Sequence, residues 1–156
     1  MTPLHYSAQN GHLEIVEFIM ANMSNKNPGS KDGTTPLHKA AKNGNLNICK
    51  FIMKKVQEKN PRTNNGWTPY HSAAANGYFK ICEYIMERIE NKNPGDNDGQ
   101  TPLHMAAEKG HLDICQLIVE TTGDKNPMMA SGHTPLGLAH QYNQHHIVRY
   151  LISTLV

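Results

Sequence analysis

The motif Thr-Pro-Leu-His recurs, with small variations, at one fixed interval along this chain. Its threonine lies every 33 residues, at Thr2, Thr35, Thr68, Thr101 and Thr134. A second motif, Lys-Asn-Pro, keeps the same interval and begins at Lys26, Lys59, Lys92 and Lys125. Self-similarity at such an interval predicts an array of stacked units, in which each unit packs on its neighbours, rather than one round core.

The longer motif is almost complete between Thr101 and Ile114, where the chain reads Thr-Pro-Leu-His-Met-Ala-Ala-Glu-Lys-Gly-His-Leu-Asp-Ile. This stretch resembles the ankyrin repeat. The resemblance covers four full units and a truncated, cap-like fifth, with the bounds 2–34, 35–67, 68–100, 101–133 and 134–156. It implies an all-α fold, a single ankyrin-repeat solenoid over residues 1–156 in which helix–turn–helix units are joined by β-hairpin-like loops.

The first half of the unit 35–67 shows how individual residues favour this structure. Thr35 can cap a helix with its hydroxyl, Pro36 suits the first helical position, and His38 can reach back to the capping residue. Gly44 can end the helix in the left-handed conformation. The resulting helix of about two turns is too short to be stable alone, so it depends on its neighbours.

A second helix with one apolar face follows in the same unit. Its apolar residues recur at helical spacing, at Leu46, Cys49, Ile52, Met53 and Val56. Pro61 prevents the helix from continuing, and Asn65-Gly66 is typical of a hairpin turn. Most of the family has Gly and Val where this chain has Val56 and Lys59. We therefore expect the second helix to run slightly longer and its last apolar residue to fill the place of that valine.

The two ends of the array differ. The fifth unit has polar residues typical of a C-terminal cap, which has one face against water: Gln141, Tyr142, Gln144, His145 and His146. The first unit has no such replacement, and its apolar residues are those of an internal unit: Leu13, Ile15, Val16 and Ile19. We therefore expect the N-terminal end to be the less stable one.

The three cysteines, Cys49, Cys82 and Cys115, also lie 33 residues apart. Equivalent positions on packed helices are about 8–10 Å apart, whereas a disulfide needs Cα atoms within about 7 Å. Each cysteine is therefore interpreted as filling a valine-sized core position, which Val16 and Val148 hold in the outer units. Free buried thiols fit a reducing compartment, and no signal peptide or membrane-length apolar run is visible. We expect an intracellular, cytoplasmic chain without membrane insertion.

Ten histidines raise the question of metal binding or general-base catalysis. Four belong to the repeated motif, at His5, His38, His71 and His104. Their spacing follows the array, so they cannot converge on one ion, and the resemblance implies a structural hydrogen-bonding role. The sequence shows no serine–histidine or cysteine–histidine constellation, glycine-rich phosphate loop or paired-carboxylate site. It therefore predicts no enzymatic activity, no cofactor and no metal.

In the ankyrin family, hairpin tips and the inner face of the first helix line a concave groove that binds partners. The resemblance implies that the groove of this chain includes Lys39, Lys42, Arg62, Trp67, Met105, Glu108, His133 and Tyr142. Trp67 is the only tryptophan, and tryptophan is enriched at interface hot spots. The predicted function is a non-catalytic scaffold that binds a protein or peptide partner, with the chain itself a monomer.

The local charge supports an alternative function. Residues 35–67 carry seven bases and one acid, a net charge of +6, whereas each of the next two units carries −2. This unit could contact a polyanion or a nucleic acid. However, Lys50, Lys54 and Lys55 lie on the second helix, away from the groove, and the neighbouring units are acidic. The sequence therefore favours a protein partner over a nucleic acid.

A further alternative treats the chain as the substrate of another enzyme. The loop asparagines Asn27, Asn60, Asn93 and Asn126 resemble the asparagine on which an iron- and 2-oxoglutarate-dependent asparaginyl hydroxylase acts in ankyrin proteins. The adjacent lysine and proline depart from the usual context. A mass increase of one oxygen on these loop peptides would identify such a modification.

Overall fold

The computed structural model describes residues 1–156 and contains ten helices and no strands. The helices form five consecutive pairs: α1 (Pro3–Asn10) with α2 (Leu13–Ala21), α3 (Pro36–Lys42) with α4 (Leu46–Lys55), α5 (Pro69–Ala75) with α6 (Phe79–Met86), α7 (Pro102–Lys109) with α8 (Leu112–Thr122), and α9 (Pro135–Gln141) with α10 (His145–Leu155). The all-α prediction is confirmed.

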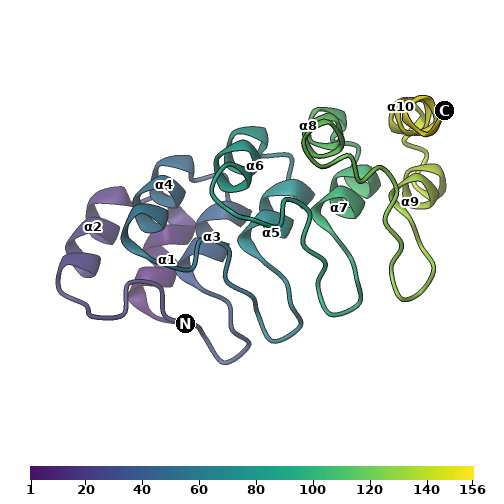
Figure 1. The fold of residues 1–156 in the computed structure, drawn as a ribbon. Coiled ribbons are helices and arrows are strands. Elements are labelled where there is room, and N and C mark those ends of the chain that lie inside the picture. The colour runs from purple at the N-terminus through teal and green to yellow at the C-terminus, as the bar shows by residue number, and fades with distance from the viewer.

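The pairs stack side by side in chain order, so the molecule is an elongated array (Figure 1). The first helices of the pairs form one layer, in which α1 packs on α3, α3 on α5, α5 on α7 and α7 on α9. The second helices form the other layer, and the loops between units project from the first layer (Figure 1). This is the predicted solenoid of helix–turn–helix units.

A threonine and a histidine cap the first helix of each of the first four units. In the second unit the backbone N–H of Thr35 donates to Nδ1 of His38 at 3.1 Å, and the Thr35 hydroxyl lies 2.9 Å from the same atom. Because Nδ1 accepts, the other ring nitrogen carries the proton and donates to the carbonyl of Trp67 at 3.1 Å. Each histidine thus connects its own helix to the loop that precedes the next unit.

The core runs along the interface between the two layers. Cys49, Cys82 and Cys115 are fully buried and unpaired, as their valine-sized position predicts. They pack in one continuous cluster with the isoleucines and methionines of the second helices. The array therefore has a single thin core that extends from the first unit to the last.

The ends of the second helices differ from the prediction. In the first three units the helix ends at Ala21, Lys55 and Met86, before the apolar residue that was expected to extend it. That expectation was wrong for helix length, but Met23, Val56 and Ile89 do pack, half-buried, against the core.

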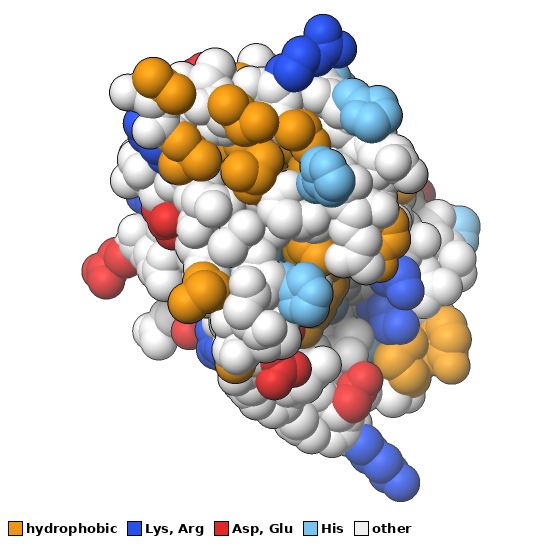
Figure 2. Space-filling model, turned by 90° about the vertical axis from the view of Figure 1, so that its right-hand side faces the viewer, with side chains coloured by type: hydrophobic (Ala, Val, Ile, Leu, Met, Phe, Trp, Pro, Cys, Tyr) orange, Lys and Arg blue, Asp and Glu red, His pale blue; other side chains and the backbone are white.

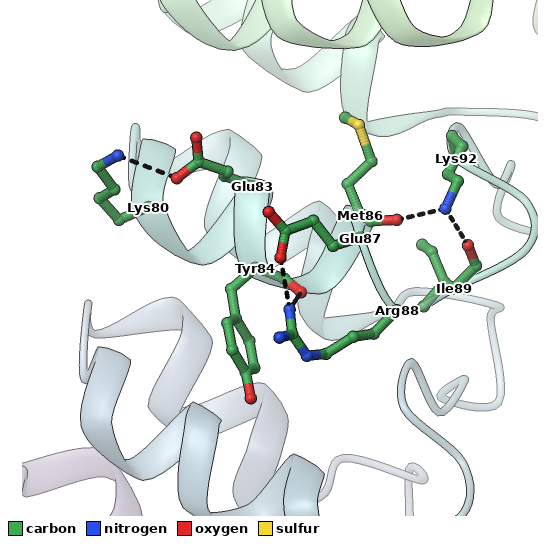
Figure 3. Close-up of polar contacts among 8 residues, drawn as sticks. All are labelled: Lys80, Glu83, Tyr84, Met86, Glu87, Arg88, Ile89 and Lys92. Carbon is green, nitrogen blue, oxygen red and sulfur yellow. Dashed lines mark hydrogen bonds and ion pairs between the residues drawn. The ribbon is translucent and has the colours of Figure 1, made fainter.

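The lysine of the Lys-Asn-Pro motif explains why the helix can stop early. In the first three units its ammonium group donates to one carbonyl in the last turn of the helix and to one just beyond the helix: Lys92 bonds to Met86 at 2.6 Å and to Ile89 at 2.5 Å (Figure 3). Lys26 and Lys59 make the equivalent pairs of bonds. The last carbonyls of a helix have no partner within the helix and favour a cation, so this lysine acts as a C-terminal cap.

The two ends of the array expose apolar side chains. Ile15 is 49% exposed, whereas its equivalent Ile48 is 2% exposed because the first unit covers it. At the other end Ile152 is 49% exposed, whereas Met53 in the same position is 1% exposed. Figure 2 looks onto the C-terminal end and shows hydrophobic side chains gathered beside histidines. The fifth unit therefore combines the predicted polar surface with an apolar one.

Candidate functional site

The loops between units form tight hairpins that are bonded to one another in a row. In the second loop Thr63 N–H donates to the Trp67 carbonyl at 2.8 Å and closes the hairpin. Asn64 N–H then donates to the carbonyl of Asp32 in the preceding hairpin at 2.9 Å, and Asn97 N–H to that of Asn65 at 3.0 Å. We call the hairpins together with the exposed side of the first helices the inner surface.

Glycine is required where neighbouring hairpins approach. Gly66 has φ +86°, and a Cβ atom there would lie 2.5 Å from the side-chain oxygen of Asn97 and 2.7 Å from its backbone nitrogen. Any other residue at this position would place its Cβ atom against the backbone of the next hairpin. It would also have to adopt a positive φ, which is strained for residues with a side chain. The close approach leaves no room for a side chain at this point of the hairpin row.

Trp67 lies at the base of its hairpin and is held on two sides. Its indole N–H donates to the Ser72 hydroxyl at 2.9 Å, and its ring centre lies 5.0 Å from that of His71 with the planes tilted by 32°. The side chain is half-buried. It also lines an open hollow of about 380 Å³ between hairpin tips, together with Asp32 and Asn64. The inner surface thus presents an aromatic ring in a preset orientation.

Asp32 stabilises the hairpin on the other side of this hollow. The Ser30 hydroxyl donates to its carboxylate at 2.6 Å, and the backbone and hydroxyl of Thr34 donate at 3.1 and 2.9 Å. These bonds, the Ser30 bond first, lower the pKa of Asp32 well below its usual value. The carboxylate is therefore charged at neutral pH and occupied within its own loop.

The basic residues predicted for the groove lie in the same part of the array. Lys39 and Lys42 project from α3, the helix that His38 connects to the Trp67 carbonyl. Lys42 is exposed and Lys39 half-buried. Arg62 is exposed, and its guanidinium donates to the carbonyl of Gly95 at 2.9 Å, across to the next loop.

The other predicted groove residues are arranged differently. Met105 is only 5% exposed and belongs to the core, so its side chain offers almost no contact area and we leave it out of the candidate site. The Glu108 side chain is 14% exposed and pairs with Lys109 at 2.7 Å. His133 and Tyr142 are exposed in the fifth unit and the hairpin before it.

The loop asparagines have a structural role that the sequence did not reveal. The side-chain oxygen of Asn60 accepts from the backbone N–H of Tyr70 at 3.1 Å, ten residues further along the chain. The equivalent bonds connect Asn27 to Leu37, Asn93 to Leu103, and Asn126 to Leu136. All four asparagines are half-buried. They fix each loop to the first helix of the following unit.

No group of three or more histidine, cysteine, aspartate or glutamate side chains is placed to hold a metal ion. None of the helices has the length and apolar character needed to cross a membrane.

One family model matches nearly the whole chain. This model, whose description is ankyrin repeats (3 copies), matches residues 4–96 and again residues 88–155. The comparison with curated proteins found no match for this chain.

Proposed function

This chain belongs to the ankyrin-repeat family, and we propose that it is a non-catalytic scaffold whose inner surface binds a peptide or protein partner. Ankyrin repeats are generally protein–protein interaction modules. The observation that carries the proposal is the fixed indole of Trp67 beside the hollow between hairpins. Because the ring and hairpins are already ordered, a partner would lose little binding energy to ordering them.

The charges of the inner surface indicate what kind of partner it would take. Lys39, Lys42 and Arg62 give this part of the inner surface a surplus of positive charge. The carboxylate of Asp32, which shares the hollow with Trp67, is bonded within its own loop, and Asp98 is an exposed acid in the next hairpin along the array. Complementary charges steer association and fix the register of a bound chain. The partner would therefore carry acidic residues near the part that contacts Trp67.

The three free, buried thiols add a proposal about location. Thiols that are kept reduced fit a reducing compartment, so we place the chain inside the cell, in the cytoplasm.

Peptide selection followed by mutation would test the function. Peptides selected from a displayed library on the parent protein should bind Trp67→Ala more weakly by about 2 kcal/mol, or about thirtyfold. The double variant Lys39→Glu, Lys42→Glu should slow association and flatten its dependence on salt. The control is Arg149→Gln on α10, on the second-helix side. If the selected peptides bind all these proteins equally, the inner surface is not the binding site.

A further inference from the structure

The exposed side of α4 carries positive charge that no ion pair neutralises. Its cations are Lys50, Lys54 and Lys55, and none of them takes part in an ion pair of the structure. On the neighbouring helix α6, Glu83 pairs with Lys80 at 2.9 Å (Figure 3). Glu87 pairs with Arg88 at 2.7 Å. Because the α6 acids are occupied by cations of their own segment, the α4 lysines remain available. We call the exposed sides of α2, α4 and α6 the outer face.

Aromatic rings contact two of the three α4 lysines. The Lys50 ammonium lies 5.5 Å from the centre of the Tyr84 ring, and the Arg88 guanidinium carbon lies 3.6 Å from it. Lys55 lies 5.8 Å from the ring of Phe51. Such contacts are attractive at exposed sites. They hold the long side chains in a preferred position, so fewer rotamers would be lost when a ligand binds.

A small apolar hollow lies beside the charge. It has a volume of about 180 Å³ and lies between α2 and α4, where Met20, Ala21 and Phe51 form its apolar lining. Lys55 lies at its rim together with Glu17. A hollow of this kind accepts one apolar side chain, and the adjacent lysines would contact the acidic residues on either side of it.

We propose that the outer face of α4 binds a short acidic peptide segment anchored by one apolar side chain. The extent of the charge favours a peptide over a nucleic acid. The ten residues of α4 span about 15 Å, and acids flank the helix on both sides, at Glu17 on α2 and Glu83 on α6. A long phosphate backbone would extend past the lysines and meet both acids. A short peptide can place its anchor in the hollow and its acidic residues along α4, on the side away from Glu17. The site lies on the opposite layer from Trp67 and does not depend on the inner surface.

The test uses a defined probe with the full chain. A short fluorescein-labelled peptide of alternating glutamate and aspartate, with one central phenylalanine, is titrated with the protein and followed by fluorescence anisotropy. We expect Lys54→Glu with Lys55→Glu to weaken binding at least about tenfold. The charge reversal Arg149→Glu, at an exposed position of α10 that belongs to neither proposed site, should change it less than about twofold. Replacing the phenylalanine of the probe by serine should also weaken binding about tenfold.

Two controls keep the outcome clear. Lysines in the last turn stabilise α4 through its dipole, so the glutamate substitutions could unfold the helix. The neutral variant Lys54→Gln, Lys55→Gln is therefore measured as well. If circular dichroism shows that the glutamate variant is unfolded, the binding of the neutral variant decides the outcome. Single-stranded oligothymidine of the same charge is the competing probe. The proposal is overturned if the parent does not bind the peptide, if both charge reversals weaken binding equally, or if oligothymidine binds as tightly as the peptide.

Discussion

Trp67 and Ser72 are joined by a hydrogen bond of 2.9 Å from the indole N–H to the serine hydroxyl, across the start of α5. Ser72 is 5% exposed, so the bond is shielded from solvent on the serine side. The bond fixes the rotation of the only indole ring in the chain. The orientation of Trp67 is therefore a property of the free protein, which a partner would find already formed.

Removing the serine hydroxyl should release the ring. We expect Ser72→Ala to lower the free energy of unfolding by about 1 kcal/mol, because the half-buried indole N–H loses its partner. The native fluorescence of Trp67 should also shift to longer wavelength. Urea unfolding and emission spectra measure the two effects. The control is Ser7→Ala. In the parent, the Ser7 hydroxyl bonds only to the carbonyls of Pro3 and Leu4 in its own helix. An unchanged emission spectrum in Ser72→Ala would contradict the assigned role.

The motif histidines should make stability depend on pH. Burial lowers the pKa of His38 and of His71 from 6.5 to about 4, although the carbonyl bonds to Trp67 and Gln100 oppose this shift. Between pH 6.5 and 4 the unfolded chain binds protons that the folded chain does not, so the free energy of unfolding falls as pH falls. Each histidine can contribute at most about 3 kcal/mol to this loss.

Urea unfolding at a series of pH values from neutral to acidic tests this dependence. Carboxylates also titrate at the acidic end, so the informative quantity is the difference between the parent and His38→Gln, His71→Gln. Glutamine can keep hydrogen bonds but takes up no proton. We expect the variant to lose less stability than the parent between pH 6.5 and 4. Parallel curves for the two proteins would show that the histidines do not cause the effect.

Tyr70 contains a buried hydroxyl that has no hydrogen-bond partner. Its side chain is fully buried, where the first, second and fourth units have Leu4, Leu37 and Leu103. An unpaired buried polar group costs about 1–3 kcal/mol. We therefore expect Tyr70→Phe to raise the free energy of unfolding by about 1 kcal/mol, measured by chemical denaturation. A lower stability of the phenylalanine variant would mean that the hydroxyl has a partner in solution, such as a buried water.

The local features of each unit were predictable from sequence because they depend on residues close together in the chain. The Thr35–His38 cap is an example. Features that depend on how units are placed could not be read in this way. The bond from His38 to the Trp67 carbonyl spans 29 residues, and only the family resemblance implied a hydrogen-bonding role that links this histidine to an adjacent loop. The bond from Asn60 to the Tyr70 N–H depends on the path of the loop.

Variation among units also gave a wrong indication of exposure at one groove position. The family resemblance placed Met105 in the groove, at a position whose residue type changes from unit to unit. Tyr6 is exposed and Lys39 half-buried, but Ser72, Met105 and Leu138 are buried. Exposure there depends on the side chain itself: long polar groups extend to solvent, whereas a short or apolar one packs inward.

The cysteines should react slowly in the native protein. Burial raises the pKa of the Cys49 and Cys115 thiols to about 12 and also raises that of Cys82. Since the thiolate is the nucleophile, all three should resist a bulky thiol reagent in native buffer and react rapidly in urea. The labelled fraction is read by mass spectrometry. Rapid labelling of all three without denaturant would contradict the burial.

The last prediction concerns the N-terminal end, where Ile15 and Ile48 occupy the same position in adjacent units. Ile48 is covered by the first unit, whereas nothing covers Ile15, and they are 2% and 49% exposed. Large-to-small changes cost most where packing is complete, so Ile48→Ala should lower the free energy of unfolding by about 2–5 kcal/mol. Ile15→Ala should cost less than about 1 kcal/mol, because its side chain is still half in water. Urea unfolding of the two variants makes the comparison within one chain. Equal losses would show that Ile15 is buried in solution and that the N-terminal face is covered, for example by association of two molecules.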